Sequence, residues 1–246
     1  MTALPRVLGA EALKLRRTLA LRLALAAPLL EVGLLFTVGL VRPQVVFRDT
    51  NLVPQFVRPI MTLWTIILLP SVVAIVAALV AGLDHDEHHW DQIFALPIRR
   101  GAVYGAKWVA ASALIALSSL TLLVSGIAAM ALLRMLVPRL HASALPARTL
   151  AAFVWRSDAA SLLLISVLFW CSLRFRSFVA PLALGAIGIV STIVLINAPG
   201  RLFAFWPWMA PVLAAPGRLP VALTLCSGAG ILAALAACWQ LSRRMA

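Results

Sequence analysis

Three of the four histidines lie beside acidic residues in the segment 84–107, which reads DHDEHHWDQIFALPIRRGAVYGAK. On a helix, His85, His88 and His89 would occupy positions i, i+3 and i+4, a spacing at which imidazoles can bind zinc. The fourth histidine, His141, follows the next long apolar run and is expected on the opposite side of a membrane. No other ligand group obviously completes a zinc site, so the role of the three histidines stays open.

The same segment also contains an apolar pattern. Residues 84–94 can form a short helix, which Pro97 would end because proline disfavours helix at the residue before it. Trp90 and Phe94 would then lie one turn apart on one side of this helix. A helix that docks on another protein is the favoured interpretation.

Motifs of common enzyme classes are absent from the sequence. The histidine-rich stretch does not match HExxH, and no GxSxG nucleophile elbow occurs. The run GAVYGAK, residues 101–107, lacks the spacing and the final Ser or Thr of a GxxxxGK[ST] phosphate loop. The chain is therefore not predicted to be an enzyme, and any use of ATP would require another polypeptide.

A single carboxylate, Glu31, falls in the middle of the first long apolar run, three residues after Pro28. An ionisable group inside a membrane costs ~3 kcal/mol or more, so it should face protein or water. It is a candidate for a polar point on a translocation path or for a proton relay. A hydrogen bond between two helices is the alternative interpretation.

The elements that must position these residues are long apolar runs. Hydrophobic residues make up 63% of the 246-residue chain, charged residues only 12%, and the mean hydropathy is +1.02. A soluble domain cannot bury that much apolar surface, whereas about 20 apolar residues form one membrane-spanning helix. The sequence predicts an all-α, polytopic membrane protein with six spans: Leu19–Leu40, Ile60–Leu83, Val109–Leu133, Asp158–Leu173 (with the helix beginning near Thr149), Phe178–Ile196 and Pro220–Trp239.

The net charge of +13 comes from clusters that flank the apolar runs, which argues against a nucleic-acid partner. With the N-terminus inside, twelve of the 21 basic residues fall in cytosolic segments and nine in outer ones. The excess on one side, and the basic N-terminal flank, predict that both termini are cytosolic. The three cysteines lie inside apolar runs and are interpreted as small core residues.

The whole chain, 1–246, is interpreted as one transmembrane domain with three special segments. Residues 1–18 place apolar side chains on one helical face, which predicts an amphipathic helix at the membrane interface. Residues 84–108 form the largest cytosolic loop, and residues 197–219, rich in proline and tryptophan, predict an outer broken or re-entrant segment. In the last span, small residues at every fourth position predict close packing, within the chain or across a dimer.

Several short stretches resemble the permease subunits of ABC-2 type exporters, especially the small bacterial permeases that confer immunity to lantibiotics and other peptide antibiotics. They are Glu11–Thr18, the loop with Ala95–Arg99 and a lysine before the third span, and Pro207-Trp208 in the last outer loop. Their order relative to six spans makes the combination more specific than any one of them. The resemblance implies a multi-pass protein of the bacterial plasma membrane.

The resemblance further implies export of an amphipathic peptide or lipid-like molecule by a permease that binds no cofactor itself. ATP and Mg would be bound by separate ATPase subunits, and a second permease copy or paralogue would complete a dimer among the membrane lipids. Contact with the ATPase is implied for Leu8, Leu15, Glu87, Trp90, Asp91, Phe94 and Leu96.

Two other function classes remain as alternatives. A membrane-embedded enzyme could use the histidine and carboxylate cluster, although the spans offer few polar residues to complete a site. A secondary transporter could move protons through Glu31, although paired charges and inverted repeats are not apparent in the sequence.

Overall fold

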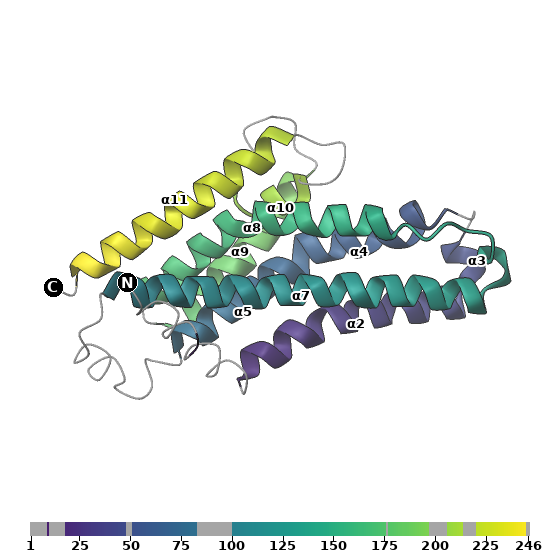
Figure 1. Cartoon of the computed structure of the whole chain (residues 1–246), viewed down its shortest axis with the longest axis horizontal. Helices are drawn as coiled ribbons and strands as arrows, with labels where there is room; N and C mark the ends of the chain where they lie inside the picture. Colours follow the sequence, from purple (N-terminus) through teal and green to yellow (C-terminus); the bar gives the residue numbers. More distant parts are fainter. Residues whose placement is uncertain are drawn as a thin grey trace.

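The computed structural model describes residues 9, 18–47, 51–82, 100–175, 177–196, 206–213 and 220–244. Within these ranges the chain is helical and contains no strand, and the long helices alternate in direction along one elongated bundle (Figure 1). The elements are α2 (Leu19–Val41), α3 (Pro43–Val46), the π-helix η1 (Val53–Val57), α4 (Arg58–Leu63), the π-helix η2 (Trp64–Leu68), α5 (Leu69–Gly82), α7 (Arg100–Leu136), the 3-10 turn η3 (Pro138–Leu140), α8 (Ala147–Phe175), α9 (Val179–Leu195), α10 (Ala210–Leu213) and α11 (Pro220–Arg244).

Each of the six predicted spans forms helix over its described residues. Four helices are long and apolar enough to cross a membrane: Leu19–Val41, Val53–Val80, Val103–Leu136 and Ala147–Phe175. Two shorter apolar helices, Val179–Leu195 and Thr224–Gln240, correspond to the fifth and sixth predicted spans. The start of the fourth helix at Ala147 confirms the expectation that it begins near Thr149. The all-α, polytopic membrane fold is thus confirmed.

The third helix begins earlier than predicted. Residues up to Lys107 were assigned to the cytosolic loop, but α7 already begins at Arg100. Val103, Tyr104 and Lys107 are buried on its first turns, so packing against the bundle extends the helix below the predicted span. At 37 residues α7 is about 55 Å long, which exceeds the ~30 Å of hydrocarbon.

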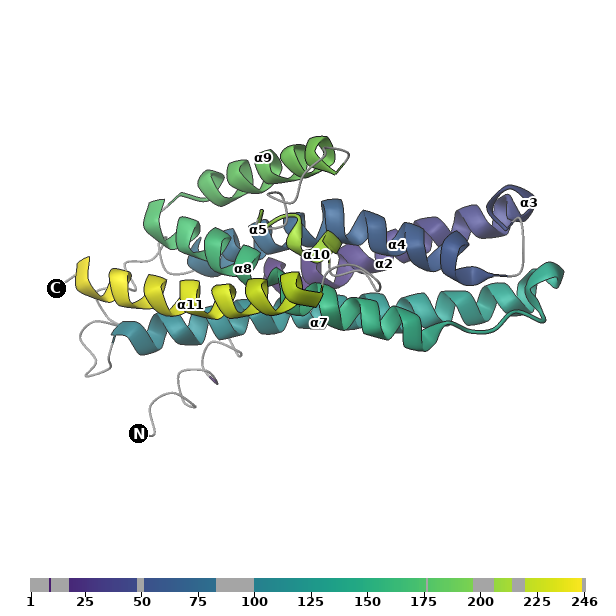
Figure 2. The ribbon, with the colours of Figure 1, turned by 90° about the horizontal axis from the view of Figure 1, so that it is seen from above.

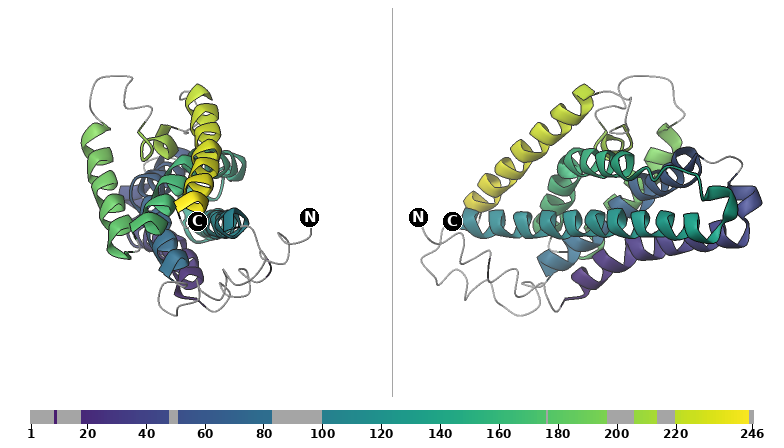
Figure 3. Two further views of the ribbon diagram at one scale, coloured as in Figure 1. Left: turned by 90° about the vertical axis from the view of Figure 1, so that its left-hand side faces the viewer. Right: turned by 45° about the vertical axis from the view of Figure 1, so that its right-hand side comes forward.

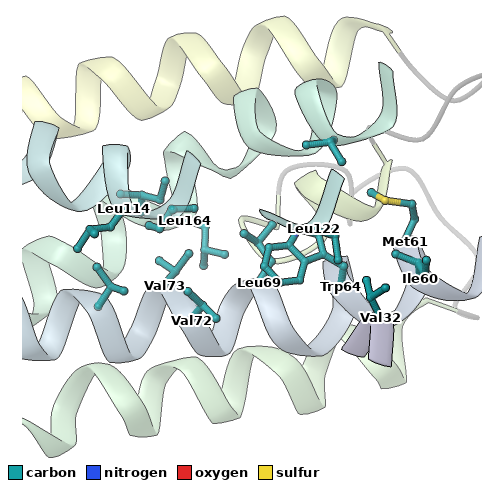
Figure 4. Close-up of a cluster of buried hydrophobic side chains, with 14 of the residues drawn as sticks. Val32, Ile60, Met61, Trp64, Leu69, Val72, Val73, Leu114, Leu122 and Leu164 are labelled. Atoms are coloured by element: carbon teal, nitrogen blue, oxygen red, sulfur yellow. The ribbon is translucent and has the colours of Figure 1, made fainter. Parts of the chain in front are cut away.

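The second span is irregular, which the sequence did not reveal. Two π-helical segments, η1 and η2, flank the short helix α4 before the chain continues as the regular helix α5. Single π-helical turns widen a helix and occur often at functional sites. This span also forms much of the core: Trp64 is fully buried, and Ile60, Leu69, Val73 and their neighbours cluster with Leu114, Leu122 and Leu164 (Figure 4).

Helix α8 lies at the centre of the bundle, with α9 and α11 on different sides of it (Figures 2 and 3). The close contact with α11 depends on Gly230, because a Cβ there would lie 2.5 Å from the backbone nitrogen of Leu163. The hydroxyl of Ser166 also donates to the carbonyl of Gly230 at 2.8 Å. Cys226, Gly230 and Ala234 are buried along this contact. The stripe of small residues in the last span therefore packs within the chain.

The segment before α11 is anchored by a tryptophan. Trp208 is only 3% exposed, and its indole fits against Gly188 of α9, where a Cβ would lie 2.0 Å from the ring. Trp206 packs against Trp208 with the ring centroids 5.4 Å apart. Trp208 is thus part of the protein interior. Within the predicted outer segment 197–219, residues 197–205 and 214–219 lie outside the described residues.

Candidate functional site

Glu31 lies on α2 and faces the second span. It is only 3% exposed, and both carboxyl oxygens are buried without a hydrogen-bond partner among the described residues. The backbone N–H of Trp64 lies close to the carboxyl group but donates to the carbonyls of Ile60 and Met61. The indole nitrogen of Trp64 also has no partner. In the described part of the chain, Glu31 therefore does not form the hydrogen bond between helices that was the alternative to a functional role.

Glu31 contributes to an apolar hollow between α2 and the second span, which we call the lateral groove. Its volume is about 380 Å³. Its walls are formed by Leu23, Ala26, Ala27, Leu30, Glu31, Leu34, Leu63, Leu68, Ser71, Val72, Ile75 and Val76. Leu30 is 73% exposed and Leu34 60% exposed, so the groove opens on the side of the bundle. A hollow of this size and lining is typical of sites for small apolar ligands.

The wall of the groove formed by α2 contains a break in the helical hydrogen bonds. Pro28 has no N–H, so the carbonyl of Ala24 loses its usual donor within the helix. The hydroxyl of Ser118 on α7 donates to this carbonyl instead. Side chains of neighbouring helices commonly satisfy such freed carbonyls in membrane proteins. Ser118 therefore holds α2 against α7 about two turns before Glu31.

Two further hollows adjoin the second span on its other sides. One of about 410 Å³ lies among η1, α4, η2, the first turns of α8 and the end of α9, and Arg58, Thr62, Thr65 and Thr149 give it a more polar lining than the groove. The other is a shallow depression between α4, η2 and α9 that shares Arg58 and Thr62 with the first. The irregular second span thus borders all three of these hollows.

The spans contain a second carboxylate, Asp158, which the sequence did not reveal as a group inside the bundle. Asp158 lies on α8, where its carboxylate accepts a hydrogen bond of 2.6 Å from the hydroxyl of Ser119 on α7. The sequence predicted that Arg156 and Asp158 lie at the start of the fourth span, at the membrane interface. Unlike Glu31, Asp158 has a hydrogen-bond donor, which identifies it as a contact between helices.

The predicted ATPase-contact residues cannot be placed. Leu8, Leu15, Glu87, Trp90, Asp91, Phe94 and Leu96 all lie outside the described residues. The same holds for His85, His88 and His89, and the described part of the chain contains no group of three potential metal ligands. The three cysteines are free; Cys171 and Cys226 are buried, as expected of small core residues, whereas Cys238 is half-buried.

Comparison with known protein families identifies most of the chain. The sequence profile described as ABC-2 family transporter protein matches residues 7–192, which include α2 to α8, most of α9 and the loop 84–108. Neither curated proteins nor solved structures give a significant match. The family match covers most of the chain, and its membrane fold agrees with the helices described above. The chain belongs to the ABC-2 family of membrane transporter proteins.

Proposed function

We propose that the chain is the permease subunit of an ATP-driven exporter that moves an amphipathic substrate, such as a peptide antibiotic or a lipid-like molecule. The observation that carries this proposal is the family match over residues 7–192. That match includes most of the N-terminal segment and all of the cytosolic loop to which contact with an ATPase is assigned. Because the sequence lacks a phosphate loop, separate ATPase subunits bind ATP and Mg.

The amphipathic character of the substrate is supported by the hollows around the second span. The lateral groove offers an apolar surface of about 380 Å³ at the side of the bundle, which a substrate dissolved in the membrane can reach without crossing water. The more polar hollow beside Arg58 lies against the first half of the same second span, next to α8 and α9. A path that joins regions of different polarity suits a molecule with both apolar and polar parts.

The proposed mechanism is alternating access driven from outside the chain. Closure of two ATPase subunits moves the loop 84–108 and the N-terminal segment, and these movements tilt the spans. The π-helical segments η1 and η2 favour a change of this kind in the second span, because such turns can be rearranged without unfolding the helix. Two permease copies, or a copy and a paralogue, complete the assembly in the bacterial plasma membrane, with the termini in the cytosol.

The decisive experiment is purification of the tagged chain with its ATPase from the native membrane. We expect ATP hydrolysis in the assembly and none in the isolated chain. The double variant Trp90→Ala/Phe94→Ala should lose the ATPase while remaining in the membrane fraction, because it removes the predicted apolar face of the loop 84–108. Trp155→Ala is the matched control, since Trp155 is 72% exposed on α8. Normal co-purification of the double variant would falsify the assigned contact.

A further inference from the structure

We infer that the lateral groove is a binding site for a primary amine carried on an apolar chain, with the carboxylate of Glu31 as the acceptor of the ammonium group. This inference rests on the proposed function, because it specifies which part of an amphipathic substrate the permease recognises. It concerns only the groove between α2 and the second span, and it does not depend on the ATPase.

The lining of the groove leaves one polar group without a partner. Ten of its twelve residues are apolar, and the other two are Glu31 and Ser71. The hydroxyl of Ser71 already donates to the carbonyl of Ile67 at 2.7 Å, within the second span. Both oxygens of Glu31 remain without a hydrogen bond in the described part of the chain. A ligand in the groove therefore meets hydrocarbon everywhere except at this carboxyl group.

The chemistry of the carboxylate selects the head of the ligand. An ionised carboxylate in apolar surroundings is stable only when donors or a cation accompany it. An ammonium group supplies three N–H donors and no acceptor, which matches two acceptor oxygens that lack any donor. A second carboxylate or a phosphate would instead be repelled. The groove thus favours a cationic head over an anionic one.

The shape of the groove selects the tail. Its exposed rim, Leu30 and Leu34, faces the outside of the bundle, so an apolar chain can enter directly from surrounding hydrocarbon. The oxygens of Glu31 lie beneath the lining, so binding of the ammonium requires rotation about the side-chain bonds of Glu31. A slender chain with a terminal amine fits this arrangement better than a bulky folded peptide.

The test uses the full chain in nanodiscs of neutral lipid and three photoreactive probes that share one dodecyl chain. The probes end in an amine, a hydroxyl or a carboxylate, and mass spectrometry locates the crosslinks. We expect the amine probe to label the groove residues about tenfold more than the carboxylate probe, the lower end of what a hydrogen bond to a charged group contributes. Equal labelling by all three probes would show that only lipid chains occupy the groove, and would overturn the inference.

Variants separate the role of the carboxylate from that of the groove. Glu31→Gln should reduce amine labelling to the level of the hydroxyl probe, and Glu31→Asp should retain part of the preference. Ala26→Phe should reduce labelling by every probe, whereas Ala128→Phe on the exposed face of α7 should change nothing. Unchanged amine labelling in Glu31→Gln contradicts the inference. Exclusion of all probes, together with crosslinks between two copies at the groove, also contradicts it, because a second copy then occupies the site.

Failure of the groove site and failure of the proposed function give different results. If the amine probe shows no preference but the assembly hydrolyses ATP normally, the groove site is rejected and the proposed permease function stands. A clear amine preference in a chain that never associates with an ATPase rejects the export mechanism but leaves the binding site.

Discussion

Single hydroxyl groups form hydrogen bonds between neighbouring helices of this bundle, one of them at a carbonyl that a proline leaves free. Ser118 donates to the carbonyl of Ala24 that Pro28 leaves free, and Ser172 donates to the carbonyl of Ala77 at 2.9 Å, from α8 to α5. Such bonds contribute about 0.6 kcal/mol on average in membrane proteins, because the unfolded helices also find partners. They therefore fix the relative positions of helices more than they determine total stability.

The pair of Pro28 and Ser118 allows a double-mutant cycle. We expect Ser118→Ala to lower the free energy of unfolding by about 0.5–1.5 kcal/mol, because the carbonyl of Ala24 then has no donor. In the Pro28→Ala background the restored N–H of residue 28 can bind this carbonyl, so Ser118→Ala should cost much less. Unfolding in mixed detergent measures both values.

Ser125→Ala provides the control for this cycle. The hydroxyl of Ser125 donates to the carbonyl of Thr121 within α7, so its removal should be nearly neutral in both backgrounds. Equal costs of Ser118→Ala with and without Pro28 would show that the hydroxyl does not compensate for the proline.

Some of these residues could be recognised from the sequence, and others could not. Glu31 could be recognised because a charge in an apolar run is conspicuous, and its isolation from donors could be judged only in three dimensions. Ser118 could not be found, because serine is common in membrane helices and the partner lies on another helix. The predicted ATPase-contact residues of the loop 84–108, such as Trp90, stay predictions.

At the level of elements, glycines determine where helices approach most closely. Gly230 brings α11 against the backbone of α8, and Gly185 brings α9 against Ala74 of α5, where a Cβ would lie 2.8 Å from the side chain of Ala74. Small residues allow such contacts in lipid, where van der Waals packing replaces the hydrophobic effect as the driving force. The position of α11 should therefore respond to a single methyl group.

Gly230→Ala is expected to lower the free energy of unfolding by about 1–3 kcal/mol, because the new methyl group overlaps the backbone of α8. It should also weaken the hydrogen bond from Ser166 to the carbonyl of residue 230. Gly228→Ala, two residues away, has nothing within 4 Å of its Cβ and should be neutral or slightly stabilising. Equal effects of the two variants in thermal unfolding would contradict the packing of α11 on α8.

Gly188→Ala tests the anchor of the segment before α11. Its methyl group would lie 2.0 Å from the indole of Trp208, so the indole must leave its site on α9. We expect a loss of about 1–3 kcal/mol in the free energy of unfolding and a red shift of tryptophan emission. Gly33→Ala, with nothing within 4 Å, serves as the control. Unchanged emission in Gly188→Ala would place Trp208 elsewhere.

Helix bounds could be predicted to the extent that hydropathy determines them. The ends of α2 and α9 were predicted within one residue, because polar or proline residues follow them closely. The start of α7 was missed because packing, not hydropathy, buries Lys107 and Tyr104. The π-helices η1 and η2 were also missed, since their sequences contain only ordinary apolar and polar residues around Pro54.

At the scale of the whole molecule, the alternating helices decide which connections share a side of the membrane. The connection between α7 and α8 and the connection between α8 and α9 lie at opposite ends of α8, and opposite ends of the bundle (Figure 1). The distribution of basic residues predicts which end faces the cytosol, with twelve on the proposed inner side and nine on the outer.

Cysteine labelling in whole cells measures this orientation. In a variant that lacks Cys171, Cys226 and Cys238, we expect Ala142→Cys to react with a membrane-impermeant maleimide in intact cells. Ser177→Cys should react only after permeabilisation, because it lies at the other end of α8. The first helix usually dominates orientation, and its N-terminal flank is strongly basic. The reverse labelling pattern would place the loop 84–108 outside the cell, where no ATPase subunit could reach it, and the proposed mechanism would then fail.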